Sequence, residues 1–208
     1  MIQAAESQTP AVRRLLEGPL TSGVALGHGH VEFGGYVVSV TPPGRPRMLN
    51  GLECAFQLQA GEQVLIGEGL MRAAGQAVRV GPDWDPRPSI EGVVAGPPAP
   101  APDPMRLAGR GPGLTPDGDD LIAGYAAGLT LLHDLEEEAT ALAEAAARRT
   151  TSLSATLLRH AARGELPEPA HAYLEHGSES ELRGWGHSSG RMLLRGLRLA
   201  GAAPRPDA

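Results

Sequence analysis

Aromatic residues and cysteine are scarce in this chain, and each scarcity narrows the class of protein. Aromatic side chains make up 3% of the 208 residues, so the core must be built from leucine, valine and alanine, with glycine allowing close approach. The single cysteine, Cys54, excludes an internal disulfide framework and fits a reducing compartment. Because Cys54 lies in an apolar run typical of a strand, we expect a buried thiol rather than a catalytic one.

Long hydrophobic runs and an excess of positive charge are also missing. The longest apolar run, residues 121–132, is shorter than the roughly 20 residues that a membrane-spanning helix needs. The polar N-terminus lacks the apolar stretch of a secretory signal. We therefore expect no membrane association and a cytoplasmic location. The formal net charge is -6 and no basic stripe is visible, which argues against nucleic acid as the main partner.

The first part of the chain, residues 1–91, has a sequence pattern typical of a β-rich domain. Overall composition, 41% hydrophobic and 20% charged, is that of a globular protein with one large domain or two small ones. After one short helical pattern near Leu15 and Leu16, short β-branched or alternating runs are separated by glycine and proline, most clearly at residues 36–40 and 52–58. This pattern predicts a small antiparallel barrel or sandwich.

The second part of the chain, residues 107–203, reads as an all-helical domain. Residues 92–106, rich in proline and alanine, predict an extended linker before it. The apolar periodicity predicts helices over residues 117–133, 135–149, 150–163, 169–176 and 191–200. The first of these is apolar nearly all round and should be the central one, with Gly124 and Gly128 admitting a second helix closely. The predicted fold class is therefore α+β.

A glycine-rich loop leads into this central helix and is the most specific stretch of the sequence. Thr115 or Asp117 can cap the helix, and Asp119 and Asp120 fall in its first turn, at the positive end of its dipole. The first-turn amides of a helix are unpaired and face outward, so the junction of loop and helix is a natural anion-binding site. The candidate anion-binding residues are Gly109, Arg110, Gly111, Gly113, Thr115 and Gly118. The alternative is an ordinary loop with an ordinary cap.

Several nucleotide and metal motifs do not fit this loop. No Gly-Lys-Ser/Thr follows it, so it is not a P-loop, and its glycine spacing differs from the dinucleotide fingerprint. We expect no resident cofactor or metal, although Mg²⁺ bridging Asp119 or Asp120 to a phosphate stays open. His28 and His30 have the spacing of a ligand pair but no third ligand at a convincing distance in sequence, so an edge strand is expected there.

Two other helix starts resemble the first in composition. Residues 186–190 contribute His187, Ser188, Ser189 and Gly190 before the last helix, and residues 150–154 are rich in hydroxyls. If the three helix starts converge, their amides and hydroxyls would form an anion pocket, with His187 as a titratable group. The alternative is that each cluster caps its own helix.

A loop in the β-rich part could add to this pocket. Residues 41–51 carry Arg47 and Asn50, and guanidinium groups suit carboxylates and phosphates. The loop could therefore reach a ligand that the helical part holds, or it could be solvated.

The glycine-rich segment, residues 109–124, resembles the signature of the AllH-type family, a subunit family of bacterial oxamate carbamoyltransferase. Residues 151–164 and 186–190 match the family in the same order, and residues 46–51 also resemble it. The resemblance covers most of residues 105–200. It implies a β-rich N-terminal part, a helical C-terminal part and an enzyme built from several different subunits.

The resemblance also implies a reaction. The family's activity is carbamoyl transfer in allantoin-derived purine catabolism, in which oxalurate and phosphate are interconverted with oxamate and carbamoyl phosphate. This chain departs from the family in a short segment between Leu174 and Trp185. It also has Arg191 and Met192 where an acidic residue often follows the second loop, which puts an identical substrate in question.

The leading hypothesis is a carbamoyltransferase-type subunit that binds phosphate or carbamoyl phosphate at the glycine-rich helix starts. Its expected partners are a small anionic substrate and other subunits, or further copies of the chain. We expect Asp119, Asp120 and His187 to be catalytic. One alternative is a non-catalytic subunit for ligand binding or assembly. Another is a stand-alone, Mg²⁺-assisted enzyme of phosphoryl or acyl transfer.

Overall fold

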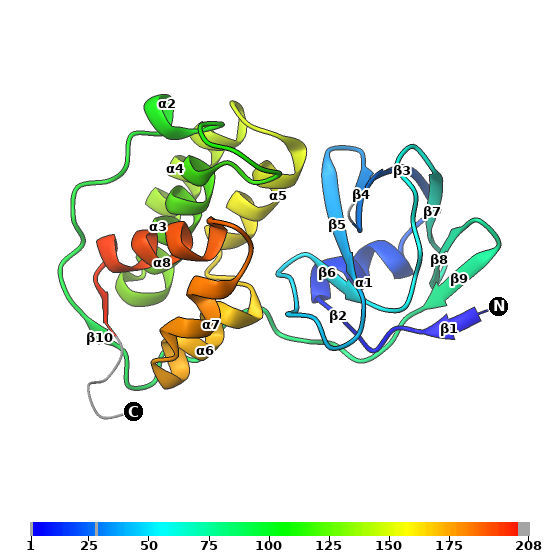
Figure 1. The fold of residues 1–208 in the computed structure, drawn as a ribbon, viewed down its shortest axis with the longest axis horizontal. Coiled ribbons are helices and arrows are strands. Elements are labelled where there is room, and N and C mark those ends of the chain that lie inside the picture. The colour runs from blue at the N-terminus through cyan, green and yellow to red at the C-terminus, as the bar shows by residue number, and fades with distance from the viewer. Residues whose placement is uncertain (1, 28, 204–208) are drawn as a thin grey trace. The chain divides into compact units, whose positions relative to one another are not determined.

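The computed structural model describes residues 2–27 and 29–203 (Figure 1). Its contacts divide the chain into two compact units, Met1–Pro86 and Arg87–Ala208. Within the described ranges, the first unit holds nine strands and one helix, and the second holds seven helices and a two-stranded ribbon. The α+β class expected from the sequence is confirmed, with the sheet in the N-terminal part and the helices mostly in the C-terminal part.

The β-rich unit is a single curled sheet. Its strands are β1 (Ile2–Ala4), β2 (Ser7–Gln8), β3 (Thr21–Gly27), β4 (His30–Phe33), β5 (Tyr36–Thr41), β6 (Gly51–Glu53), β7 (Gln63–Gly67), β8 (Leu70–Ala73) and β9 (Gln76–Arg79). They pair in the order β1-β9-β8-β7-β3-β4-β5-β6-β2. Most pairs are antiparallel as predicted, but β1 runs parallel to β9 and β5 runs parallel to β6.

The two edge strands of this sheet are neighbours in the sequence. Between β1 and β2, the Ala5 amide donates to the Arg79 carbonyl at 3.0 Å, and the Glu6 amide donates to the Glu53 carbonyl at 2.8 Å. The first residues of the chain therefore pair with β9 through β1 and with β6 through β2, and so connect the two ends of the strand order. These strands were not predicted, because runs of two or three residues are too short to show a period.

The core of the β-rich unit is mostly aliphatic, as the shortage of aromatic residues requires, and Phe33 and Phe56 are its buried aromatic side chains. Helix α1 (Pro10–Glu17) buries Val12 and Leu16 against the inner face of the sheet. Cys54 is 1% exposed, and burial raises the pKa of its thiol to about 11. Its predicted burial is therefore confirmed, and the thiol is neutral and unreactive at physiological pH.

The helical unit contains α2 (Pro104–Leu107), α3 (Asp117–His133), α4 (Glu136–Ala147), α5 (Ser152–Ala161), α6 (Glu168–His176), α7 (Glu179–Gly184) and α8 (Ser189–Leu199), with β10 (Val94–Ala95) paired to β11 (Ala202–Ala203). The predicted helices are confirmed apart from small shifts of their ends, whereas α2 and α7 were not predicted.

The stretch expected as a linker, residues 92–106, runs along the helical unit. In this stretch, the Ala99 amide donates to the Leu199 carbonyl at 2.7 Å, and the Ala99 carbonyl accepts from the Tyr125 hydroxyl at 2.7 Å.

Helix α3 is the centre of the helical unit, and α8 packs directly on it (Figure 1). A Cβ atom on Gly124 would lie 2.1 Å from the Leu193 carbonyl oxygen, and one on Gly196 would lie 2.2 Å from that of Leu121. Glycine is therefore required on both sides of the crossing, and the close approach predicted at Gly124 is confirmed. None of the helices in the described part of the chain has the length and apolar character needed to cross a membrane.

Candidate functional site

The glycine-rich loop lies flat against the start of α3 and the segment before α5. Gly109 has φ +69° and a Cβ atom on it would lie 2.7 Å from the Arg149 carbonyl oxygen. Gly111 has φ +123°, and its Cβ atom would lie 2.6 Å from the Asp117 nitrogen. Both the backbone conformation and the lack of space therefore require glycine at these positions.

Asp119 ties the loop to two helices. Its side chain is buried, and one oxygen accepts a hydrogen bond from the Gly109 amide at 2.9 Å. The other oxygen accepts from the Thr150 hydroxyl. Because both carboxylate oxygens are engaged, Asp119 holds the loop, the first turn of α3 and the segment before α5 together.

Asp120 faces the start of α8. Its Oδ2 accepts from the Thr115 hydroxyl at 3.3 Å, and the Thr115 and Ser189 hydroxyls are 2.9 Å apart. Burial raises the pKa of Asp120 to about 7, with smaller contributions in the same direction from the charges of Asp119 and Asp117, while the hydroxyls oppose the shift. Asp120 therefore exchanges a proton near neutral pH.

Asp117 makes the third connection. It is the first residue of α3, and its Oδ1 accepts from the Ser188 hydroxyl, which precedes α8. The three helix starts singled out in the sequence, at α3, α5 and α8, therefore lie together, joined by hydrogen bonds between hydroxyls and carboxylates. We call this group the acidic junction; its members are Thr115, Asp117, Asp119, Asp120, Thr150, Ser188 and Ser189.

The capping predicted for α3 is wrong. The N-cap residue is Pro116, and no side chain caps the helix, because the Thr115 hydroxyl bonds to the side chains of Asp120 and Ser189 and the Asp117 carboxylate accepts from Ser188. The first-turn amides are also engaged: the Gly118 amide donates to the Arg110 carbonyl at 2.9 Å, and those of Asp119 and Asp120 donate to the Pro116 carbonyl. The expected free amides are thus occupied in this conformation.

Two other glycines of the predicted site are explained by packing. A Cβ atom on Gly118 would lie 2.0 Å from the Leu107 carbonyl oxygen, and one on Gly190 would lie 1.6 Å from that of Leu182. These glycines let the starts of α3 and α8 contact the neighbouring backbone. Gly113 has φ +94° but its Cβ atom would meet little, so its conformation alone favours glycine.

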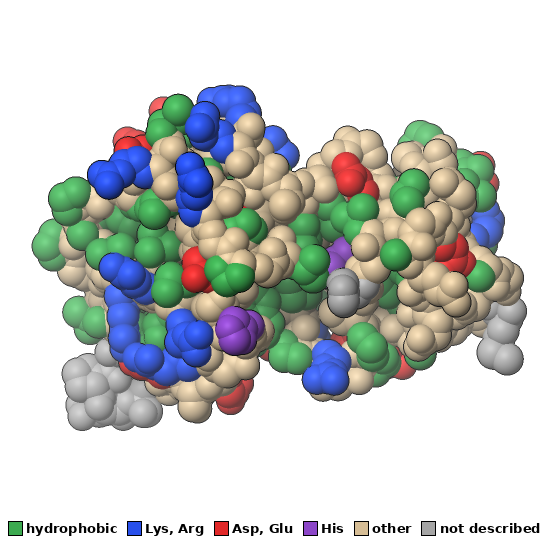
Figure 2. Space-filling view, turned by 45° about the horizontal axis from the view of Figure 1, so that its top comes forward, with side chains coloured by type: hydrophobic (Ala, Val, Ile, Leu, Met, Phe, Trp, Pro, Cys, Tyr) green, Lys and Arg blue, Asp and Glu red, His purple; other side chains and the backbone are tan. Residues whose placement is uncertain are grey.

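Several arginines lie close in sequence to members of the acidic junction. The chain has no lysine, so the basic groups on the helical unit in Figure 2 are all arginines. Arg110 is exposed on the loop, and Arg149 lies directly before Thr150. In the described residues, neither makes an ion pair, nor do Arg106 and Arg148. His187 is exposed beside Ser188, and its ring makes no hydrogen bond with any residue of the described ranges.

Residues 107–201 match the family model of the oxamate carbamoyltransferase subunit AllH. The resemblance expected from the sequence is therefore confirmed over this range, which relates the chain to a carbamoyltransferase subunit. No match was found among curated proteins or among solved structures. The AllH match contains every member of the acidic junction. Of these members, Asp117 and Thr150 were not among the predicted site residues, because their partners lie 71 and 31 residues away.

The two predicted site residues outside the AllH match have contacts within the β-rich unit. Asn50 is fully buried, donates to the Val37 carbonyl at 2.7 Å and accepts from the Ser39 hydroxyl at 3.0 Å. Arg47 lies 3.5 Å from Glu53 and 5.9 Å from the Trp84 ring centroid. These contacts hold their own loop in place, and a part in ligand binding stays a prediction.

No group of three or more His, Cys, Asp or Glu side chains that could hold a metal ion occurs in the described ranges. His28 lies outside those ranges, and the Nδ1 atom of His30 is 3.1 Å from the Ser39 hydroxyl. Asp119 and Asp120, the residues considered for Mg²⁺, accept hydrogen bonds from the Thr150 and Thr115 hydroxyls.

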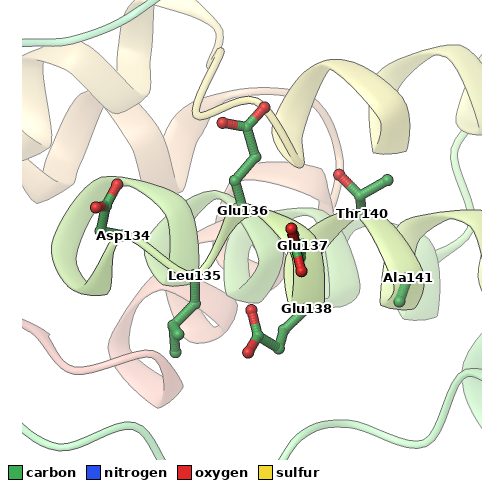
Figure 3. A pocket seen from close by; sticks show the side chains of 7 residues that line it. All are labelled: Asp134, Leu135, Glu136, Glu137, Glu138, Thr140 and Ala141. Atoms are coloured by element: carbon green, nitrogen blue, oxygen red, sulfur yellow. The ribbon is translucent and has the colours of Figure 1, made fainter.

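An open hollow of about 860 Å³ lies at the turn between α3 and α4, outside the acidic junction. Figure 3 shows carboxylates along its lining, which comprises Asp134, Leu135, Glu136, Glu137, Glu138, Thr140 and Ala141. A second hollow of about 220 Å³ shares Glu136 and Thr140 with it and extends to Arg159 and Arg163. The larger hollow carries only negative charge, so it does not suit an anionic substrate.

Proposed function

We propose that this chain is a carbamoyltransferase subunit whose acidic junction binds a small anionic carbamoyl donor or acceptor. The observation that carries the proposal is the meeting of three helix starts around Asp119 and Asp120, with the Thr115 hydroxyl in contact with the Asp120 carboxyl group and Ser189 beside it. The AllH match over the same residues supports it. The reaction that the family resemblance implies is the interconversion of oxalurate and phosphate with oxamate and carbamoyl phosphate.

The reaction needs a group that both gives and takes a proton. A phosphate oxygen attacks the carbamoyl carbon of oxalurate, and the bond from that carbon to the amide nitrogen breaks. The nitrogen leaves as oxamate after taking a proton from Asp120, and the proton of the attacking hydrogen phosphate returns to the Asp120 carboxylate. A carboxyl group with a pKa of about 7 suits both transfers near neutral pH.

The groups near Asp120 are assigned the other tasks of the reaction: polarising the carbamoyl carbonyl, neutralising the phosphate and positioning the site. Ser189 and Thr115 form a hydroxyl pair that leads from Asp120 to the half-buried surface of the junction and can donate to the carbamoyl oxygen. Arg110 and Arg149 are exposed and make no ion pair with the residues that the structure describes, so they can neutralise the phosphate. Asp119 has both oxygens engaged and serves as a positioning residue. His187, beside Ser188, is the second candidate for proton transfer.

A non-catalytic role is the competing function. It is favoured by the fact that Asp117, Asp119 and Asp120 all accept hydrogen bonds from groups of the same unit. Such bonds could serve only to hold three helices together, and the chain would then support assembly or ligand binding for a catalytic partner. The two functions differ in whether Asp120 is needed for turnover.

The test is a thermal-unfolding scan of the full chain with phosphate, carbamoyl phosphate and oxamate, singly and in pairs, with and without Mg²⁺. A ligand at 100 times its dissociation constant adds about 2.7 kcal/mol to the free energy of unfolding. We expect a rise in Tm with phosphate or carbamoyl phosphate that is lost in Arg110→Gln and Arg149→Gln. No shift with any of these ligands would contradict binding by the isolated chain.

Turnover of the assembled enzyme then separates catalysis from assembly. We expect Asp120→Asn to abolish carbamoyl transfer while the subunits still co-elute on size exclusion. Asp134→Asn is the matched control, because Asp134 has φ 58°, a conformation that asparagine tolerates, and lies outside the junction. Full activity of Asp120→Asn would favour the non-catalytic role.

A further inference from the structure

The outer face of the sheet in the β-rich unit carries an aliphatic stripe. Along β3, Gly23 and Ala25 point into the core, so Val24 and Leu26 point outward and are 39% and 44% exposed. On the neighbouring strand β7, Leu65 points outward and is 39% exposed. Large aliphatic side chains gathered on one sheet face, rather than scattered singly, indicate a surface that another molecule covers.

Opposite charges flank this stripe on its two sides. The strands lie in the order β8-β7-β3-β4. On one side, Glu32 of β4 pairs in register with Val24, and on the other side Arg72 of β8 pairs in register with Leu65. Leu65 in turn pairs with Ser22, two residues before Val24. The face is thus acidic along one margin, apolar in the middle and basic along the other margin.

We propose that this stripe is the interface of a symmetric dimer, in which a second copy of the chain packs its β3–β7 face on the first. A two-fold axis parallel to β3 places the acidic margin of each copy over the basic margin of the other, so that Glu32 of one copy and Arg72 of the other lie on the same side of the interface twice, two residues apart along the strands. The aliphatic side chains Val24, Leu26 and Leu65 then meet their counterparts in the middle. An apolar centre with a polar rim is the usual anatomy of a protein interface.

The choice of a second copy rests on this self-complementarity. A face with one charge sign on both margins would repel its own copy under either two-fold arrangement, whereas these margins attract when the axis follows the strands. Packing of two sheets face to face at a small angle is also a standard arrangement, and it requires no change in either sheet. This surface belongs to the β-rich unit and is independent of the proposed catalysis.

The first test is the mass of the full chain in solution, measured by sedimentation equilibrium at low and high micromolar concentration. We expect twice the chain mass of 21.6 kDa for the wild type and the chain mass alone for Leu65→Glu. Met105→Glu is the matched control, because Met105 is 59% exposed in the helical unit, and it should leave the mass of the dimer unchanged. A monomeric wild type at high micromolar concentration would overturn the proposal and leave a different subunit as the occupant of the face.

The second test reverses the charges and does not depend on the apolar stripe. We expect Glu32→Arg and Arg72→Glu each to weaken dimerisation at least tenfold, because each places like charges opposite one another twice. The double variant restores the pairing in the opposite sense and should regain most of the affinity. Circular dichroism checks that each variant is folded. A dimer that tolerates both single reversals would show that the copies associate through another surface.

Discussion

The carboxyl group of Asp120 ties the stability of the helical unit to pH. Its pKa is about 7 in the folded chain and lies near 3.8 when the group is solvated, so the folded state holds an extra proton between these values. The free energy of unfolding therefore falls as pH rises from about 4 to about 7, with a slope of up to about 1.4 kcal/mol per pH unit from this one group. Above the folded pKa, the charged carboxylate stays buried and its cost is constant.

Asp120→Asn should remove this dependence. Asparagine is neutral at every pH and its amide oxygen can still accept from the Thr115 hydroxyl. We expect the variant to be more stable than the wild type at pH 8, on the order of 2 kcal/mol, and about equally stable at pH 4. Denaturant titrations at several pH values measure the free energy of unfolding of the variant and of the wild type. If the two chains keep the same difference in stability from pH 4 to pH 8, the pKa of Asp120 is not raised by folding, and the proton transfer assigned to it near neutral pH fails.

Thr150 is the residue that fixes Asp119, and its hydroxyl can be removed with little change in volume. Thr150→Val leaves one buried oxygen of Asp119 without its donor, which should cost about 1 to 3 kcal/mol of stability. Thr150→Ser keeps the hydroxyl and is the control. We expect thermal unfolding to show a clear loss for the valine variant and little for the serine variant. A valine variant as stable as the wild type would mean that the Thr150 hydroxyl does not stabilise the fold.

At the scale of single residues, the sequence singles out the polar residues at the helix starts as candidates for a site, but it does not predict which of them bond to one another. Asp119, Asp120, Thr115 and the 186–190 loop were all singled out from composition and position at helix starts. The partners of the carboxylates could not be read, because hydrogen bonds such as Ser188 to Asp117 span 71 residues. The predicted capping failed because the Thr115 and Asp117 side chains bond to other side chains, those of Asp120, Ser189 and Ser188, and not to the first-turn amides of α3.

Among the helices and strands, the long periodic segments were predicted best. Helix α3 begins at Asp117 and ends at His133, as expected, because a proline and an acidic first turn mark its start and Asp134 in the left-handed region marks its end. Helix α7 (Glu179–Gly184) was missed, since six residues provide too little periodicity. The parallel pairing of β5 with β6 was also missed, because pairing direction depends on the path of the loop between them.

The crossing of α3 and α8 depends on glycine at the contact. Gly124→Ala places a methyl group where the Leu193 carbonyl oxygen lies, and because that oxygen belongs to helix backbone, the two helices must separate. We expect a loss of about 1 to 3 kcal/mol, typical of overpacking, measured by chemical denaturation. Gly184→Ala is the control, because a Cβ atom on Gly184 meets nothing within 4 Å. A tolerated Gly124→Ala would mean that the helices cross less closely.

The whole chain is two units with separate aliphatic cores. One core contains Ile66 and its neighbours on the sheet, and the other contains Leu158 and the residues around α3. The sequence predicted a β-rich part and a helical part from a change between short alternating runs and long helical periods. The closure of the sheet by the first residues of the chain was not visible, because it depends on contacts between Ala5 and Arg79 that no local pattern records.

Because the two cores are separate, we expect a destabilising substitution in one unit to leave the local stability of the other unit unchanged. Ile66 and Leu158 are both fully buried, so replacing either by alanine should cost about 2 to 5 kcal/mol. We expect Ile66→Ala to speed amide hydrogen exchange in β5 and β7 while exchange in α3 and α8 is unchanged, and Leu158→Ala to do the reverse. Exchange followed by mass spectrometry on the full chain measures both variants together. Faster exchange in both units after either substitution would mean that the cores open as one cooperative structure, and that ligand binding at the acidic junction would then also stabilise the sheet.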